Sequence, residues 1–305
     1  MKIDVVYVFC CKKDLYLTRV CIASIRYWNK TIPVSLIKDN SHGFFDTCEM
    51  EKSFHLDIAP IHLNNLGFYS KLYPFFNGNG ERALLMDSDI VWVGNLIQHL
   101  EKFDEDLIIQ GYSPDSVQQE MEKWFFNVDN LQSYYPDYSY PGYLFNCGQM
   151  ILNTAKFSPR DFSTCIEWKE NMRPYKENVF TGEDQGILNY VVAAKKKKEE
   201  ISIRLHNFFL WGWDPVASQI NAKDINNFNG QPFLIHWYGS KNGLLSFLPN
   251  SELLKFYEKY YYKFIKLGSI KMVWSRLKRT ILHFNAFAYE ILKKVYYIRK
   301  SSKRI

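Results

Sequence analysis

The feature that most constrains this chain is a pair of aspartates, Asp87 and Asp89, directly after a short apolar run. The run at residues 82–86 is continuous and short, which is typical of a buried strand. In open α/β sheets, ligands bind at the carboxyl ends of the strands. Two carboxylates there suit Mg²⁺ or Mn²⁺. We therefore expect Asp87, Ser88 and Asp89 to form a ligand-binding edge; a plain acidic turn after a strand is the alternative.

Strands and helices are predicted to alternate through the first part of the chain. The pattern favours strands at residues 3–9, 33–37, 57–63 and 82–86, and helices at residues 15–28 and 68–76. This alternation indicates βαβ units and a largely parallel sheet, which is an α/β fold. The acidic Asp4 and the short apolar stretch around it predict a first strand rather than a signal peptide.

The middle of the chain is less regular. Residues 112–143 are rich in Tyr, Pro, Asp and Gln, and we expect an irregular excursion with one helix. A buried strand is predicted at residues 144–152, a helix from Ser158 to about residue 171, and another helix from Thr181. The charge run at residues 195–200 is interpreted as a solvated helix end. It is not a nucleic-acid site, because no aromatic residues interleave with it.

Composition excludes several classes of protein. The 305 residues are 47% hydrophobic, enough to bury a core, so a largely disordered chain is excluded. None of the six cysteines forms a CxxC pair or a zinc-type cluster, which favours a reducing compartment, the cytoplasm. No stretch approaches 18 uncharged apolar residues, so no membrane-spanning helix is expected.

Positive charge is concentrated at the C-terminal end. Residues 268–305 contain ten Lys or Arg and one acid, Glu290, so they carry +9, whereas the whole chain carries +6. The remaining residues are therefore mildly acidic, at −3. Apolar residues recur every three or four positions between Ile270 and Tyr296, which predicts an amphipathic helix. Basic residues mixed with aromatic ones are typical of helices on anionic membranes; a helix packed on the domain is the alternative.

Three later segments carry polar residues between apolar ones. They are residues 145–153 (Phe-Asn-Cys-Gly-Gln-Met-Ile-Leu-Asn), 182–189 (Gly-Glu-Asp-Gln-Gly-Ile-Leu-Asn) and 235–241 (Ile-His-Trp-Tyr-Gly-Ser-Lys). His236 follows an apolar run and could supply a metal ligand, although a core histidine would look the same. Gly239 would let the backbone approach a phosphate, and Lys241 would add a point charge.

Together with the Asp-Ser-Asp segment, this ordered set resembles glycosyltransferase family 8. The resemblance covers about residues 1–245 and implies a GT-A fold, that is, a Rossmann-like, mixed and mainly parallel sheet. It implies metal-dependent transfer of a hexose from a UDP-sugar, with retention of configuration, to a hydroxyl of a glycan or lipid-linked saccharide. Bacterial lipopolysaccharide synthesis is the corresponding pathway. We expect a catalytic domain at residues 1–250 and a basic helical tail at 251–305, which would hold the enzyme on the inner face of the cytoplasmic membrane.

The resemblance also implies a role for each matching residue. Asp87, Asp89 and His236 would hold Mn²⁺ or Mg²⁺. Asn146 would lie near the hydroxyls of the donor sugar, where Gly148 avoids a clash. Asp184 would bind sugar hydroxyls, and Gln185 would lie near the anomeric carbon. Lys71 would pair with the diphosphate or with Asp87. The remaining expected donor-binding residues are Tyr16 for the uracil, Asp39 for the nucleobase or ribose, Ser88 in the Asp-Ser-Asp turn, and Gly239 and Lys241 at a phosphate.

Two competing interpretations remain at this stage. Residues 87–91 also satisfy the DxDx[TV] pattern of haloacid-dehalogenase-like phosphatases, although in those proteins the motif follows the first strand. A non-catalytic module that binds a glycan or a membrane is the second. The Trp211-Gly212-Trp213 segment also has two interpretations. It could be a loop over an acceptor, or its two indoles could pack on each other.

Overall fold

Seven strands form the central sheet of the computed structural model, which describes residues 1–60, 67–77, 79–112, 117–167, 173–174, 178–181, 183–238 and 244–302. The strand order is β12-β6-β9-β4-β1-β2-β3. The strands are β1 (Val5–Cys11), β2 (Val34–Asp39), β3 (Asp57–Ile58), β4 (Arg82–Asp87), β6 (Leu107–Ile109), β9 (Gln149–Asn153) and β12 (Ile203–Leu205). All neighbours pair in parallel except β9, which runs antiparallel to β4 and β6. The predicted α/β fold with a mainly parallel sheet is confirmed.

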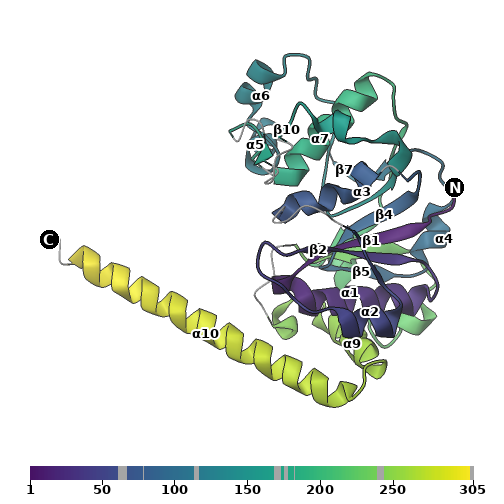
Figure 1. Cartoon of the computed structure of the whole chain (residues 1–305). Helices are drawn as coiled ribbons and strands as arrows, with labels where there is room; N and C mark the ends of the chain where they lie inside the picture. The colour runs from purple at the N-terminus through teal and green to yellow at the C-terminus, as the bar shows by residue number, and fades with distance from the viewer. Residues whose placement is uncertain are drawn as a thin grey trace.

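Side chains of β1 alternate between two apolar cores, one on each face of the sheet. Val6 and Val8 belong to the core that contains α1 (Leu15–Trp28), α2 (Cys48–Phe54) and α9 (Ser251–Lys263). Tyr7 and Phe9 belong to the core beneath α3 (Tyr73–Asn77), α5 (Val117–Trp124), α6 (Val128–Tyr134) and α7 (Glu183–Lys197). Figure 1 shows these two helical layers on either side of the sheet. Burial on both faces explains why the strand sequences are continuously apolar.

The strand register brings the acidic residues to one edge of the sheet. Phe9 pairs with Asp87 across β1 and β4, and Cys11 pairs with Asp39 across β1 and β2. Both aspartates therefore lie at the carboxyl ends of parallel strands, where the sequence placed a ligand-binding edge.

A second, three-stranded sheet aligns the histidine with this edge. It consists of β13 (Phe209–Trp211), β14 (Phe233–His236) and β5 (Ile90–Val93), and the last of these begins directly after Asp89. Because β14 is antiparallel to β5, His236 pairs with Ile90. The histidine is therefore adjacent to the Asp-Ser-Asp turn although about 150 residues separate them in the sequence.

Several local predictions are wrong. The predicted strand at residues 144–152 is interrupted: β8 (Leu144–Phe145) pairs with β7 (Gly111–Tyr112), and β9 starts only at Gln149. Residues 112–143 contain two helices, α5 and α6, rather than one. The predicted helix from Ser158 ends after the 3₁₀ turn η4 (Pro159–Phe162), because Phe162 is buried in the core and β10 (Ile166–Glu167) follows.

The charge run after α7 is also less solvated than expected. Lys195 is buried, and its ammonium forms ion pairs with Asp161 at 2.9 Å and Glu200 at 2.8 Å. These carboxylates offset the cost of burying the lysine, and they attach the end of α7 to η4. The other lysines of the run are exposed, as predicted; they are Lys196, Lys197 and Lys198.

The C-terminal residues form two helices with different surroundings. α9 packs against α1, where the Tyr257 hydroxyl donates to the Trp92 carbonyl and accepts from the Trp28 indole. α10 (Gly268–Ser302) then turns away and projects from the body as a single long helix (Figure 1). Its start requires glycine, because a Cβ on Gly268 would clash with the Tyr262 carbonyl.

No helix in the described part of the chain is long and apolar enough to cross a membrane. The division at residue 250 stays a prediction.

The first turns of α10 are attached to α9 by a buried carboxylate. Glu258 is 4% exposed and accepts hydrogen bonds from Arg276, at 2.8 Å, and from Arg279. We predict that Glu258→Gln destabilises the chain by about 2 kcal/mol. The value is lower than for a fully buried pair because Arg276 is partly exposed. Urea unfolding measures this change. Glu252→Gln, in an exposed pair with Lys255, should leave the free energy of unfolding unchanged within the error of the measurement. Equal effects of the two substitutions would contradict the prediction.

Candidate active site

The backbone holds both aspartates of the Asp-Ser-Asp turn from two sides. The Asp87 N–H donates to the Gly148 carbonyl at 2.7 Å, and the Asp89 carbonyl accepts from the Trp237 N–H at 3.0 Å. Ser88, between them, is buried. The turn is therefore fixed at once by the loop before β9 and by the residue after β14, so the carboxylates have little positional freedom.

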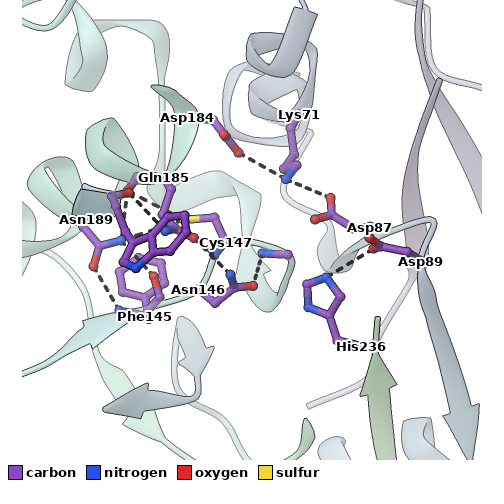
Figure 2. Close-up of polar contacts among 12 residues, drawn as sticks. Lys71, Asp87, Asp89, Phe145, Asn146, Cys147, Asp184, Gln185, Asn189 and His236 are labelled. Carbon is purple, nitrogen blue, oxygen red and sulfur yellow. Dashed lines mark hydrogen bonds and ion pairs between the residues drawn. The ribbon is translucent and has the colours of Figure 1, made fainter. Parts of the chain in front are cut away.

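Three side chains from this region could hold a metal ion. Ligand atoms of Asp87, Asp89 and His236 lie within 4.8 Å of one another. The His236 Nε2 is 3.2 Å from an Asp89 carboxylate oxygen, and both side chains are 2% exposed (Figure 2). The buried His236 Nδ1 has no hydrogen-bond partner among the described residues. Two carboxylates and an imidazole are a plausible donor set for Mn²⁺ or Mg²⁺.

Gly148 keeps the space between these ligands open. A Cβ at this position would lie 2.6 Å from His236 Cε1, 2.7 Å from the Asn146 Oδ1 and 3.0 Å from an Asp87 carboxylate oxygen. These separations are too short for any other residue type without displacing its neighbours. The clash that Gly148 avoids here is with side chains of the protein, since Asp87, His236 and Asn146 share one small volume. Its role next to the donor sugar stays a prediction.

Lys71 lies between two of the predicted functional carboxylates. Its ammonium is 2.8 Å from Asp87 and 3.2 Å from Asp184, and the side chain is 6% exposed (Figure 2). Burial alone would lower the pKa of Lys71, but the carboxylates of Asp184 and Asp87 raise it, and the net pKa lies above the usual lysine range. Lys71 is therefore a fixed positive charge at neutral pH.

The cluster as a whole has an excess of negative charge. Burial raises the pKa of the Asp184 carboxyl, Lys71 opposes that effect, and Asp87 adds to it. In formal charge, the three carboxylates of Asp87, Asp89 and Asp184 face one lysine. The two uncompensated charges equal the charge of one divalent cation, which is a second reason why the donor set fits such an ion.

Asn146 and Gln185 are joined where the predicted strand is interrupted. The Gln185 Oε1 accepts from the Asn146 Nδ2 at 3.1 Å and from the Cys147 N–H at 3.3 Å, while its Nε2 donates to the Trp124 carbonyl at 3.2 Å. The Asn146 Oδ1 accepts from the Gly148 N–H at 2.8 Å. These bonds connect the first turn of α7 to the metal-ligand group, so the structure brings Asn146, Gly148 and Gln185 together as predicted.

Asn189 positions this arrangement and was missed by the sequence analysis. Its side chain accepts from the Phe145 N–H at 3.1 Å and donates to the Phe145 carbonyl at 2.9 Å. The side chain is buried on α7 and satisfies both backbone groups of a strand residue. The available signal was an asparagine within the apolar stripe of the helix, four residues after Gln185.

The remaining predicted residues are spread more widely. Asp39 is buried at the end of β2, where its carboxylate accepts from the Ser41 N–H and hydroxyl at 2.8 Å each. Tyr16 lies in the first turn of α1, with the Arg279 guanidinium of α10 5.1 Å from its ring centre. Gly239 and Lys241 lie outside the described residues, so their predicted roles have no structural counterpart here.

An aromatic cleft of about 480 Å³ borders the predicted catalytic residues. It is lined by Gln110, Tyr112, Glu120, Trp124, Asn146, Gln185, Phe209, Trp211, Trp213 and Tyr238. Trp211 and Trp213 stack with ring centres 5.2 Å apart and an angle of 2°. Trp211 also lies 5.1 Å from the His236 ring. The packed-indole interpretation of the Trp-Gly-Trp segment is therefore confirmed. The same two rings also line the cleft, and a loop over an acceptor stays a prediction.

This fold is that of GT-A glycosyltransferases. The chain belongs to glycosyltransferase family 8, since residues 20–242 match the family described as "Glycosyl transferase family 8". This match accounts for the later motifs as well as the Asp-Ser-Asp turn, so the phosphatase interpretation is set aside. A comparison with proteins of curated function gives no significant match.

Solved glycosyltransferase structures share the fold at low sequence identity. The apo form of GlyE from Streptococcus pneumoniae TIGR4 is 16% identical with a TM-score of 0.50; the match covers 95% of this chain and 64% of GlyE. The apo structure of the bifunctional WbbM is 12% identical with a TM-score of 0.52 and coverages of 90% and 51%. The galactosyltransferase LgtC, in complex with donor and acceptor sugar analogues, is 13% identical with a TM-score of 0.50 and coverages of 84% and 95%. This chain therefore spans about two thirds of GlyE and half of WbbM.

The geometry around Gly148 gives a direct test of the metal site. We predict that Gly148→Ala weakens Mn²⁺ binding about 100-fold, the upper range for changes that displace metal ligands, because the added methyl would push against His236 and Asn146. Mn²⁺ titration followed by electron paramagnetic resonance measures the affinity. Gly230→Ala, in an exposed loop where the methyl meets only the Phe228 ring, is the matched control. Unchanged Mn²⁺ affinity in Gly148→Ala would show that the ion does not occupy this space.

Proposed function

We propose that the chain transfers a hexose from a UDP-sugar to a hydroxyl of a glycan or lipid-linked saccharide, with retention of configuration, in the synthesis of a bacterial cell-surface polysaccharide such as lipopolysaccharide. The observation that carries this proposal is the buried Asp87, Asp89 and His236 group beside Lys71, with an aromatic cleft next to it. Membership of family 8 supports the transferase class. The LgtC structure, which holds donor and acceptor sugar analogues, supports a site for two sugars.

Asp87, Asp89 and His236 would hold Mn²⁺ or Mg²⁺ in this scheme. When bound, such an ion acts as a Lewis acid that stabilises a leaving diphosphate. Lys71, next to Asp87, would add a second positive charge to that of the ion. This charge is permanent at neutral pH because the pKa of Lys71 is raised. Acceleration would come from this preorganised electrostatic environment and from the positioning of donor and acceptor.

Asp184, Asn146 and Gln185 would surround the donor hexose. The Gln185 carbonyl oxygen already accepts two hydrogen bonds, from the Asn146 amide and from the Cys147 N–H. A carboxamide oxygen has two lone pairs, so both are engaged in holding the loop. This arrangement favours a positioning role for Gln185. It supports attack by the acceptor hydroxyl on the face from which the diphosphate leaves, in preference to a covalent intermediate on Gln185.

The aromatic cleft is the proposed acceptor site. It borders Asn146 and Gln185, and Trp213 at its rim is 54% exposed. Aromatic walls with a few polar groups are typical of ligand sites, and flat indoles can cover the apolar faces of sugar rings. An acceptor bound there would place a hydroxyl next to the donor site while the indoles exclude water from it.

The C-terminal helix supports a location on the cytoplasmic face of a membrane. Large apolar side chains of α10 are exposed among basic ones, with Val273, Trp274 and Phe284 each about 60% exposed or more. An exposed stripe of this kind fits the interface of an anionic bilayer. A lipid-linked acceptor would give the enzyme a reason to work there.

The metal site is tested by removing one ligand. We predict that Asp89→Asn abolishes Mn²⁺-dependent binding of the UDP-sugar that the wild-type protein hydrolyses in a screen of UDP-hexoses. The reason is that the turn loses one of its two carboxylate ligands while the backbone bond to Trp237 remains. Calorimetry with and without Mn²⁺ measures the affinity, and Asp224→Asn, on an exposed loop, is the control. Unchanged metal-dependent affinity in Asp89→Asn would refute the assignment, and no hydrolysis in the whole screen would favour a non-catalytic module.

Asp184 is tested by separating turnover from binding. We predict that Asp184→Asn lowers kcat about 100-fold and changes donor affinity much less, because its contacts with the sugar matter most in the transition state. Steady-state kinetics and donor titration distinguish the two effects. Equal losses in kcat and in donor affinity would indicate that Asp184 serves mainly to hold Lys71 and the start of α7.

A further inference from the structure

A second cleft lies outside the catalytic cluster, between the start of α1 and the first half of α10. Its volume is about 840 Å³. It is lined by Lys12, Lys13, Leu15, Tyr16, Arg19, Glu49, Tyr261, Tyr262, Lys271, Trp274, Ser275, Lys278, Arg279, Leu282 and His283. The walls therefore come from the β1–α1 connection, from α9 and from the long helix. Arg19 fixes their spacing by donating to the Tyr262 hydroxyl at 3.2 Å and the Ser275 hydroxyl at 3.3 Å.

The cleft is strongly basic. Six of its lining residues are Lys or Arg, and Glu49 is the only acid among them. Glu49 pairs with Lys271, and Arg279 is held by Glu258 from outside the cleft. Among the ion pairs of the described residues, none joins Lys12, Lys13 or Lys278 to a carboxylate, and Lys13 contacts the His42 ring at 3.4 Å. A concave surface with charge of one sign concentrates the electric field, so this cleft attracts anions.

On its α10 wall the cleft has an apolar rim of exposed side chains. Trp274 and Leu282, both on its α10 wall, are 66% and 57% exposed. Further large side chains of the same helix are exposed next to them: Ile270, Val273, Leu277, Ile281 and Phe284. A basic hollow with an apolar rim matches an amphiphile whose head is anionic and whose body is hydrocarbon.

We propose that this cleft binds the phosphate of an anionic phospholipid headgroup, while the apolar rim enters the acyl region. This inference rests on the membrane association proposed above. A soluble nucleotide explains the lysines but leaves the exposed Trp274 and Leu282 without a role. Moreover, the Arg279 guanidinium already covers one face of the Tyr16 ring, on which a nucleobase would stack.

Headgroup binding would also orient the active site. The cleft begins at Lys12, directly after the carboxyl end of β1, and the same edge of the sheet carries Asp87. α10 projects beyond the body on this side (Figure 1). A phospholipid held between α1 and α10 would therefore place the catalytic edge close to the bilayer, where a lipid-linked saccharide can reach it.

The test uses the full-length chain, metal-free in EDTA, and calorimetric titration with dihexanoyl-phosphatidylglycerol below its micelle concentration. The double variant Lys13→Gln and Lys278→Gln changes one lysine on each wall. We expect saturable binding to the wild type, weakened about 30-fold in this variant. The estimate follows because a basic residue near an anionic headgroup contributes about 1 kcal/mol, and 1.4 kcal/mol is a factor of ten. The matched control, Lys196→Gln with Lys198→Gln, removes the same charge from exposed positions at the end of α7 and should bind like the wild type.

Three further arms make the outcome decisive. Sedimentation with phosphatidylglycerol vesicles tests membrane association itself: if the wild type does not bind them, that proposal fails and the cleft inference fails with it. If vesicles bind but both double variants retain lipid affinity, only the cleft inference is wrong. If UDP or inorganic phosphate binds the metal-free wild type as tightly as the short-chain lipid and loses affinity in the Lys13 and Lys278 variant, the cleft is a nucleotide or phosphate site. Thermal melting followed by circular dichroism confirms that each variant is folded.

Discussion

The ion pairs of Lys71 with Asp87 and Asp184 connect the parts of the site that come from different layers of the fold. Asp87 ends β4, Lys71 lies in the 3₁₀ segment η2 (Gly67–Leu72), and Asp184 lies in the first turn of α7. A buried lysine is costly unless carboxylates surround it, and two buried carboxylates repel each other unless a cation lies between them. Each element therefore needs the other two, which sets the distance between the metal ligands and the start of α7.

The interruption between β8 and β9 has a comparable effect on the rest of the site. Continuing the strand through Asn146 and Gly148 would point alternate side chains to opposite faces. Instead, Asn189 binds both backbone groups of Phe145, and the Gly148 carbonyl accepts from the Asp87 N–H. The break after β8 thus places the Asn146 side-chain amide and the Gly148 backbone next to the residues that could hold a metal ion. The strand pattern is interrupted where the chemistry is proposed to occur, as expected for a functional site.

The two C-terminal helices, α9 and α10, have different surroundings. α9 completes the core against α1. In residues 268–285, where the structure describes the side chains of α10, Lys271, Arg276 and Arg279 pair with the body, while many large apolar side chains are exposed. A helix with so much exposed apolar surface is poorly explained by packing on its own body. The basic cleft at its base is connected to this surface, because two of the exposed apolar side chains, Trp274 and Leu282, line the same cleft as its lysines.

The sequence by itself determined the α/β alternation, the full extent of the first helix, the edge that carries Asp87, and the family resemblance. These depend on local periodicity and on short motifs, which are visible along one chain. Tertiary structure alone decided the break after Phe145, the burial of Lys195 and the end of the helix predicted from Ser158. In each case a partner distant in sequence outweighed the local pattern: Asn189 for the strand, Asp161 for the lysine, and the core around Phe162 for the helix. The cleft between α1 and α10 was also decided by tertiary structure alone. Arg19 and Ser275, which join its walls, are separated by 256 residues.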